Sequence, residues 1–231
     1  MVVALGLTGA SAQARCADVA LVLAIDASGS VSDADFYLQI AGYYAALNHP
    51  DVIVALAEAG TVDLAAVFWA DSAYKPQIIG WHRVDHPSDA RAFAKALIAE
   101  PRLVAGNTDI GVGIYAALDL FAEPGRCAHK AIIDISGDGR SSFPGRRHNF
   151  QALSPARQQA LDRGIVINAL AITSEDLKLG EYYTKYVSGG FGSFVMEVGS
   201  FETFHVAITQ KLARELLSKT MSTRLEPHAP G

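Results

Sequence analysis

The sequence predicts an α/β fold: a doubly wound, mostly parallel sheet of six strands, with helices on both faces and one antiparallel edge strand. Three observations support this prediction. Short apolar runs of strand length alternate along the chain with segments of helical periodicity. Half of the 231 residues are hydrophobic and only 19% are charged, as suits a sheet buried on both faces. Two of the apolar runs end abruptly in polar turns, where sheets of this class place their binding sites.

The expected strands are short and rich in Val, Ile, Leu and Ala. Residues 19–25 contain no polar side chain, which indicates a strand buried on both faces. Residues 76–84 follow the preceding strand closely, so we expect them to form the antiparallel edge. In chain order, the six strands are predicted at residues 19–25, 62–70, 76–84, 131–135, 165–172 and 193–198.

The expected helices have recognisable ends. Ser32, Asp33 and Asp35 place a hydroxyl and two acids at the cap and first turn of the first helix, and Pro50 follows its end. Gly164 has the position of a glycine that terminates a helix. The predicted helices are residues 32–47, 51–58, 87–99, 107–121, 155–163, 177–187 and 202–217.

We expect a signal peptide at residues 1–14, one domain over residues 15–217 and a flexible tail at residues 218–231. The first fourteen residues carry no charge and end in Ala12-Gln13-Ala14, which fits a small-x-small cleavage site. The basic segment that opens such a peptide is missing, so we expect these residues to be part of a longer one. The alternative is an N-terminal arm without a role in export. Export predicts a periplasmic or secreted protein.

Charge and hydropathy exclude two classes of partner. The formal net charge is −5 and no basic stripe offsets it, so we expect no binding of nucleic acid. No apolar run reaches the length of roughly 20 residues that a membrane-spanning helix needs, so we expect no transmembrane segment.

The two cysteines, Cys16 and Cys127, each lie just upstream of an apolar strand. If those strands are parallel neighbours, both cysteines lie at the same end of the sheet. A disulfide there would close a loop of about 110 residues and contribute roughly 4–5 kcal/mol in the chain-entropy model. Two unpaired buried thiols are the alternative.

Three polar stretches follow strand ends or precede a helix. The first is Asp26-x-Ser28-x-Ser30, the second contains Thr108 and the third contains Asp138. If the strands that carry Asp26 and Asp138 are adjacent, their carboxylates lie side by side and repel each other unless a cation or a proton lies between them. Three hydroxyls and two carboxylates form an all-oxygen set, which favours Mg²⁺ or Mn²⁺ and is unsuited to zinc.

With these residues, the sequence resembles the von Willebrand factor A (vWA) domain family and its metal-ion-dependent adhesion site (MIDAS). The resemblance extends over residues 19–217. Within the family, the chain is similar to a bacterial, exported subgroup whose function is undefined. It implies a Rossmann-like vWA fold and a site whose five metal ligands are Asp26, Ser28, Ser30, Thr108 and Asp138. Gly29, Asp109 and Gly137 are expected to support this site without binding the metal.

The resemblance implies a divalent-cation-dependent, adhesion-type module that binds a protein partner. The neutral hydroxyl ligands would leave the ion electrophilic, so an Asp or Glu carboxylate of the partner is expected to complete the metal shell. Alternatives are an accessory subunit of a periplasmic complex, a structural domain with a vestigial site, and a Mg²⁺-dependent hydrolase. We expect no enzyme, because the sequence contains neither a Gly-x-Ser-x-Gly nucleophile motif nor a phosphate-binding loop, and Ser28 stands where hydrolases of the Asp-x-Asp type have an acid.

Several of these residues have plainer alternatives. The two acids suit helix caps at strand ends, and the two serines suit a turn. Asp134 lies within a predicted strand and has no expected metal role. His129 and His148 flank the region and are expected to be solvated or hydrogen-bonded rather than catalytic. The two tryptophans, Trp69 and Trp81, are expected to pack in the core or against the sheet edge.

Overall fold

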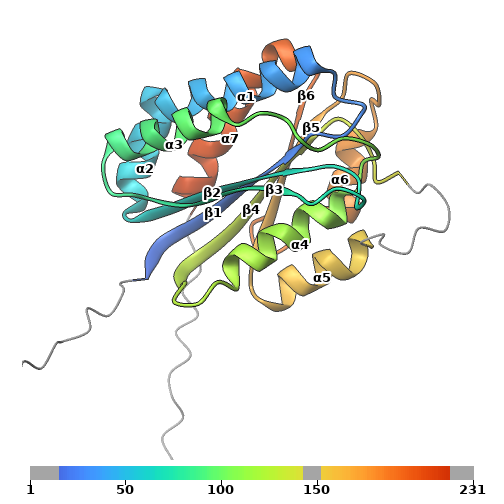
Figure 1. Ribbon diagram of the computed structural model, residues 1–231. Helices are drawn as coiled ribbons and strands as arrows, with labels where there is room; N and C mark the ends of the chain where they lie inside the picture. The colour runs from blue at the N-terminus through green and yellow to red at the C-terminus, as the bar shows by residue number, and fades with distance from the viewer. Residues whose placement is uncertain (1–15, 143–151, 219–231) are drawn as a thin grey trace, which may run out of the picture.

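The computed structural model describes residues 16–142 and 152–218 and places a six-stranded sheet between two layers of helices (Figure 1). The strand order is β3-β2-β1-β4-β5-β6. All neighbouring strands are parallel except β2 and β3, which are antiparallel. The strands are β1 (Ala17–Asp26), β2 (Val62–Trp69), β3 (Gln77–Val84), β4 (Ala128–Gly137), β5 (Val166–Ile172) and β6 (Val195–Val198). The predicted sheet, with its antiparallel edge strand, is therefore confirmed.

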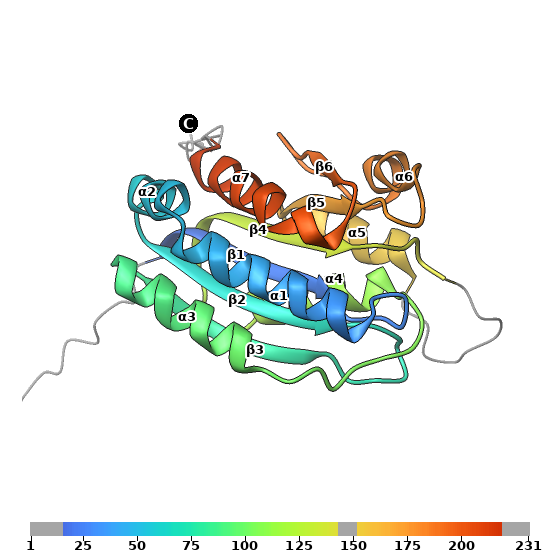
Figure 2. The same ribbon diagram turned by 90° about the horizontal axis from the view of Figure 1, so that it is seen from above.

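Helices cover both faces of the sheet (Figures 1 and 2). One layer contains α1 (Asp33–Asn48), α2 (Pro50–Ala59), α3 (Pro87–Ala99) and α7 (Phe204–Leu217). The other contains α4 (Ile110–Phe121), α5 (Leu153–Asp162) and α6 (Leu179–Tyr186). In the part of the chain that the structure describes, no helix is long and apolar enough to cross a membrane.

Strand β1 lies in the interior of the sheet because its side chains are apolar in both directions. Leu21, Leu23 and Ile25 pack against the layer that contains α1 and α7, whereas Val22 and Ala24 pack against the layer that contains α4 and α5. A strand that is apolar on both faces suits the interior of a sheet covered by helices on both sides, and β1 pairs with β2 on one side and with β4 on the other. This central position brings the polar end of β1 to the middle of one edge of the sheet.

The structure corrects some predicted boundaries. Strand β4 begins at Ala128, before the predicted start at residue 131, because the polar residues before that point still pair in register with β1. The predicted helix at residues 202–217 is divided into a 3₁₀ turn, Phe201–Thr203, and α7. The expected signal peptide at residues 1–14, His148 and all of the expected tail after Ser218 lie outside the described residues.

Cys16 and Cys127 form a disulfide that joins the starts of β1 and β4. The two strands are parallel neighbours, with Ala17 paired to Ala128, so both cysteines lie at the same end of the sheet. The predicted pairing is confirmed, and the alternative of two free thiols is wrong. The bridge closes a separation of 111 residues.

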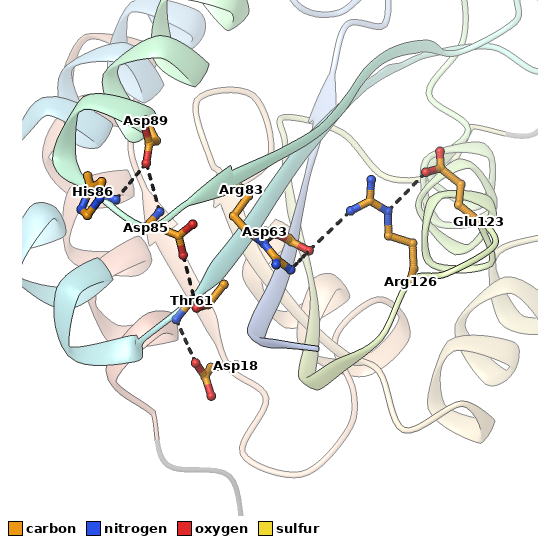
Figure 3. Close-up of polar contacts among 9 residues, drawn as sticks. All are labelled: Asp18, Thr61, Asp63, Arg83, Asp85, His86, Asp89, Glu123 and Arg126. Carbon is orange, nitrogen blue, oxygen red and sulfur yellow. Dashed lines mark hydrogen bonds and ion pairs between the residues drawn. The ribbon is translucent and has the colours of Figure 1, made fainter. Parts of the chain in front are cut away.

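Charged side chains are paired at the same end of the sheet (Figure 3). The buried carboxylate of Asp63, on β2, accepts a 2.9 Å hydrogen bond from Arg83 on β3 and lies 3.5 Å from Arg126, which also pairs with Glu123. A second series of hydrogen bonds ties the turn before α3 to the starts of β1 and β2, through Asp18, Thr61, Asp85, His86 and Asp89. The ion pairs and the disulfide thus lie at one end of the sheet, and the polar loops predicted to bind a metal lie at the other.

Helix α7 is fixed to the sheet by a buried ion-pair cluster. The Lys211 ammonium lies 2.5 Å from Asp134 on β4 and 2.6 Å from Glu215, and all three side chains are fully buried. This contact explains why a charged residue occupies the interior of β4. As expected, Asp134 has no place among the predicted metal ligands. Burial, together with repulsion from Asp134, raises the pKa of Glu215 to about 8 against the opposing effect of Lys211.

Candidate metal-ion site

Three loops meet at the carboxyl edge of the sheet. Asp26 is the last residue of β1, and Asp138 directly follows Gly137, the last residue of β4. Because β1 and β4 are parallel neighbours, with Ile25 paired to Ser136, the two acids emerge at the same edge. The third loop leads into α4 and carries Thr108. The structure therefore brings together all five residues that the sequence predicts as ligands.

The Ser28 hydroxyl contacts the other two hydroxyls of the site. Ser28 Oγ lies 3.1 Å from Ser30 Oγ and 3.1 Å from Thr108 Oγ1, although Thr108 is 80 residues further along the chain. Ser30 Oγ donates a 2.6 Å hydrogen bond to Asp138 Oδ1. Side chains from three loops thus form one continuous set of oxygen atoms.

Asp26 is fully buried and only half satisfied. Its Oδ1 accepts a 2.8 Å hydrogen bond from the backbone N–H of Ser28, within its own loop. Its Oδ2 is buried and has no hydrogen-bond partner among the described residues. Burial, with a further contribution from the nearby negative charge of Asp138, raises the pKa of Asp26 to about 7 against the opposing effect of the Ser28 hydrogen bonds. A buried carboxylate oxygen without a donor is costly unless a proton or a cation satisfies it.

Asp138 is also buried, and burial raises its pKa above the usual range, while the hydrogen bond from Ser30 acts in the opposite direction. Asp26 and Asp138 therefore repel each other when both are charged, so each disfavours the charged form of the other. A divalent cation between the carboxylates would relieve the repulsion at both of them.

The donor set fits a hard divalent cation. Two carboxylates and three hydroxyls provide only oxygen, which Mg²⁺ and Mn²⁺ prefer. In the described part of the chain, no group of three or more His, Cys, Asp or Glu side chains is placed to hold a metal ion. The unpartnered Oδ2 of Asp26 provides an independent reason for a cation here.

Two glycines, Gly29 and Gly137, allow the loops to approach one another. A Cβ at Gly137 would lie only 2.7 Å from Asp26 Oδ2 and 2.7 Å from the Tyr183 hydroxyl, so no larger residue fits beside the acid. Gly29 donates its N–H to the carbonyl of Gly106 over 2.7 Å, and a Cβ there would lie 3.1 Å from the same oxygen. Gly29 thereby holds the loop that carries Ser28 and Ser30 (the serine loop) against the loop that carries Thr108.

Asp109 lies at the N-cap position of α4 and is buried next to Thr108. The sequence predicts a helix-opening residue here, and the structure places it so, although its side chain does not cap the helix. Thr108 itself is held from the other side: its N–H donates to Ser142 Oγ over 3.0 Å, and its carbonyl accepts the N–H of Ser142 over 2.9 Å.

Sequence reasoning missed a buried chain of hydrogen bonds behind Asp26. Gln39 on α1 donates to the Asp26 carbonyl over 2.9 Å and accepts a 2.9 Å hydrogen bond from Ser136 on β4. The Tyr43 hydroxyl lies 3.1 Å from Ser136 Oγ, and all these side chains are buried. The available signal in the sequence was Ser136, because its hydroxyl directly follows the predicted strand at residues 131–135. Gln39 and Tyr43 give no such signal, since their partners are more than ten residues away.

Sequence reasoning also missed two residues whose hydrogen bonds hold the loops in position. Arg102 donates to the carbonyls of Ala27 and Ser28, at 2.9 and 2.6 Å, and so clamps the backbone of the serine loop. Asp71 accepts hydrogen bonds from the backbone and side chain of Asn107, beside Thr108. The signal for Asp71 was its position, because it directly follows the apolar run of β2, as Asp26 follows that of β1.

The histidine and the two tryptophans discussed from the sequence lie outside the metal-ion site. His129 is exposed near the start of β4, at the disulfide end of the sheet. Trp69 is fully buried in the core, and Trp81 packs against Phe121, so both take the packing role that the sequence predicts.

The chain matches one protein-family model over residues 15–220, and the description of that family is "Protein of unknown function (DUF1194)". No curated protein matches the chain.

Solved structures with similar folds include a mussel byssus protein and two pilus proteins. Proximal thread matrix protein 1 from the mussel byssus has a TM-score of 0.62 at 16% identity over 87% of this chain and 46% of its own, and a second structure of it is described as having a zinc-occupied MIDAS motif. The pilus adhesin SpaC from Lactobacillus rhamnosus GG has a TM-score of 0.61 at 16% identity, over 88% and 30% of the two chains. The vWF domain of the type V pili tip protein Mfa5 from Porphyromonas gingivalis has a TM-score of 0.56 at 12% identity, over 90% and 99%.

These likenesses establish the fold and nothing finer. This chain spans less than half the length of the mussel protein and about a third of SpaC. The resemblance to vWA domains drawn from the sequence is confirmed at the level of the fold: the sheet with its two helical layers is a Rossmann-like vWA fold.

Proposed function

The chain belongs to the DUF1194 family, and from the geometry of its site we propose that it is a divalent-cation-dependent module that binds a protein partner. One observation carries this proposal: the buried, unpartnered Oδ2 of Asp26 lies in a loop whose hydroxyls are in contact with one another and with Asp138. Asp26, Ser28, Ser30, Thr108 and Asp138 would hold the ion.

The identity of the ion follows from the ligand chemistry. We propose Mg²⁺ or Mn²⁺, because a site of hydroxyls and carboxylates provides no nitrogen or sulfur ligand. The mussel protein is described with zinc in its MIDAS motif, so Zn²⁺ is the natural competitor in a binding assay. Such a cation, when bound, provides an electrophilic centre with a coordination position for an outside oxygen.

The protein's own residues determine what the outside ligand is. Three of the five proposed ligands are neutral hydroxyls, and a carboxylate that acts through water instead of binding directly would leave a bound cation with part of its positive charge. A partner's Asp or Glu carboxylate is the protein group that best neutralises this charge. SpaC and Mfa5, which share the fold, are pilus proteins, and this supports an adhesion-type role.

We also propose that the protein works in an oxidising compartment, the periplasm or the cell exterior. The Cys16–Cys127 disulfide supports this proposal, because disulfides persist there and are rare in the reducing cytosol.

A chelator-controlled capture experiment tests the function. The wild-type protein and Asp138→Ala are immobilised in parallel and incubated with cell-envelope extract in Mg²⁺. Proteins bound to wild type should be released by EDTA and should not bind Asp138→Ala. Binding that survives EDTA, or that Asp138→Ala retains, would contradict a role of the metal site in partner binding.

A further inference from the structure

Two acids and one lysine lie together in the core between β4 and α7. Lys211 Nζ is 2.5 Å from Asp134 Oδ1 and 2.6 Å from Glu215 Oε1, and none of the three side chains has any exposed surface. Burying charged groups costs free energy even when they are paired, and here two acids share a single lysine. The cluster thus keeps three reactive groups away from water, although the proposed metal site uses none of them.

The fold holds the carboxyl group of Asp134 against Lys211. Asp134 lies two residues after Ile132 on β4 and therefore points to the same face, where Ile132 belongs to the core cluster that includes apolar residues of α7. Lys130, on the same face of β4, donates from Nζ to the backbone carbonyl of Glu215 over 2.6 Å. The end of α7 is thereby fixed on β4, with the two acids on either side of the lysine nitrogen.

The two contacts of the Lys211 nitrogen differ in kind. Towards Glu215 it donates a 2.6 Å hydrogen bond. Its contact with Asp134 is closer than the roughly 2.7 Å of a short charge-assisted N–H···O bond, yet neither carboxyl oxygen of Asp134 has a hydrogen-bond partner among the described residues. Glu215 is therefore placed to exchange a proton with the nitrogen, whereas the Asp134 carboxyl group is placed to be attacked by it.

We propose that Lys211 and Asp134 condense to an amide (isopeptide) bond, with Glu215 as the catalytic acid and base. A proton first passes from the ammonium group to the Asp134 carboxylate, which gives an amine and a carboxylic acid. The nitrogen lone pair then attacks Asp134 Cγ, while Glu215 gives its proton to the carboxyl oxygen that becomes negative and takes one from the attacking nitrogen.

A second proton exchange of the same kind completes the reaction. Glu215 protonates one hydroxyl on Cγ, which leaves as water, and takes the proton from the other, which becomes the amide carbonyl. The N–Cγ bond thus replaces a Cγ–O bond, one water is released and Glu215 is regenerated. The condensation needs no oxidant, reductant or cofactor, and it does not depend on the metal site.

The buried environment favours both the reaction and its product. The amide is neutral, so condensation removes an ammonium group and a carboxylate from surroundings that penalise charge. Contact between the reacting groups replaces an encounter in solution with an intramolecular step. Burial, with repulsion from Asp134, raises the pKa of Glu215 to about 8 against the effect of Lys211, so this acid holds the required proton at neutral pH.

The amide would complete a covalent path through the domain. The disulfide joins Cys16 to Cys127, at the start of β4. The amide would join Asp134, further along β4, to Lys211 on α7. A force that pulls on the two ends of the domain would then pass through these two bonds and the short segment between Cys127 and Asp134. All five proposed metal ligands lie in the two loops that the bonds close, so the site would be shielded from tension.

Peptide mapping of the full chain tests the bond. The protein is purified at neutral pH, reduced and alkylated to open the disulfide, and digested with trypsin, which does not cleave after an acylated lysine. We expect an intact mass lower than that of the unlinked chain by one water molecule. We also expect a branched peptide that joins residues 131–140 to residues 186–214, with fragment ions that place the link between Asp134 and Lys211.

The same map separates this bond from two other losses of water. A cyclic imide at Asp138-Gly139 would give the same intact mass but no branched peptide. A lactam between Lys211 and Glu215 would remain within residues 186–219 and would leave residues 131–140 unlinked. Either product in place of the branched peptide, or a chain of full mass, would overturn the inference.

Glu215→Gln tests the catalytic role of Glu215. Gln keeps an acceptor for Lys211 but cannot exchange protons as a carboxyl group does, so the linked fraction should grow at least about a hundredfold more slowly after synthesis. Glu58→Gln, at an exposed position on α2, is the matched control and should link like the wild type. Asp134→Ala should yield chains of full mass, and circular dichroism checks that each variant is folded.

The variants also state what would contradict the assignment of roles. Linkage of Glu215→Gln at the rate of the wild type would remove Glu215 as the catalyst. Loss of water in Asp134→Ala, with Lys211 still blocked to trypsin, would remove Asp134 as the acyl partner. If Asp134→Ala fails to fold, the branched peptide of the wild type decides the same point without it.

Discussion

Ser30 and Asp138 are 108 residues apart in the chain, yet Ser30 Oγ donates a 2.6 Å hydrogen bond to Asp138 Oδ1. The contact forms because β1 and β4 are parallel neighbours whose carboxyl ends open at the same edge of the sheet. It links the serine loop to the second acid before any cation is considered. The site is therefore organised by the fold, so that a cation would find its ligands already close together.

Removing one hydroxyl should weaken metal binding without unfolding the protein. Thr108→Val keeps the size of the side chain but removes the oxygen that lies 3.1 Å from Ser28 Oγ. We expect the affinity for Mg²⁺ or Mn²⁺ to fall at least about tenfold, as measured by calorimetric titration. Thr184→Val, which removes a hydroxyl from an exposed residue on α6, is the matched control and should bind like the wild type. Equal affinities for Thr108→Val and the control would remove Thr108 from the ligand set.

Gly137→Ala should disturb the site by steric overlap. The new methyl group would lie 2.7 Å from Asp26 Oδ2 and from the Tyr183 hydroxyl, so the acid or the tyrosine must move. We expect a loss of about 1–3 kcal/mol in the free energy of unfolding, measured with urea, together with weaker metal binding. A Cβ at Gly199 meets nothing within 4 Å, so Gly199→Ala serves as the control. Wild-type stability and affinity in Gly137→Ala would show that the close approach is not required.

Loss of the disulfide should destabilise the protein without altering the metal site. The bridge closes a separation of 111 residues at the far end of the sheet, and a loop of this length corresponds to about 4–5 kcal/mol in the chain-entropy model. The double variant Cys16→Ser/Cys127→Ser should therefore unfold at a much lower urea concentration, yet bind Mg²⁺ with unchanged affinity while folded. An unchanged midpoint of unfolding would contradict the stabilising role of the bridge.

The ion-pair cluster of α7 should make stability depend on pH. Burial raises the pKa of Glu215 from 4.5 to about 8, with Asp134 adding to the shift and Lys211 opposing it. Between these values the folded protein keeps a proton that the unfolded chain has released, so stability falls as pH rises towards 8.

Glu215→Gln removes this titration and retains an oxygen that can accept the hydrogen bond from Lys211. Between pH 5 and 8, without metal, the free energy of unfolding of the wild type should fall by up to about 4 kcal/mol more than that of Glu215→Gln. The exposed Glu58→Gln should follow the wild type. Parallel stability curves for wild type and Glu215→Gln would mean that Glu215 titrates normally in the folded state.

The sequence predicts the sheet and the ligand loops because both depend on local patterns. Residues 19–25 are apolar throughout, which already indicates a buried strand, and the polar motif at Asp26 marks its end. The boundary of β4 was harder to predict, because Lys130 is polar and pairs with Val19 on β1 only through the tertiary fold. Pairing between distant segments decides such positions.

The supporting residues of the site show the same limit. Arg102 reaches the carbonyls of Ala27 and Ser28 across 75 and 74 residues, and no local pattern marks an arginine for this role. Gln39 similarly lies on the buried face of α1, where its polar side chain gives no indication of its partner. The sequence identifies groups that would bind a metal by their chemistry, but the groups that position them become visible only once the loops are assembled.

Calorimetric titration of Mg²⁺ and Mn²⁺ into wild type and Asp26→Asn tests the metal site most directly. Asn at this position can still accept the hydrogen bond from the Ser28 N–H but removes the buried charge. Asp176→Asn, at a half-buried acid that pairs with Arg140, is the matched control. We predict one ion bound per chain in the wild type and in Asp176→Asn, and an affinity at least about tenfold lower in Asp26→Asn. Equal affinity in wild type and Asp26→Asn, or no binding to the wild type, would contradict a metal site at this edge of the sheet.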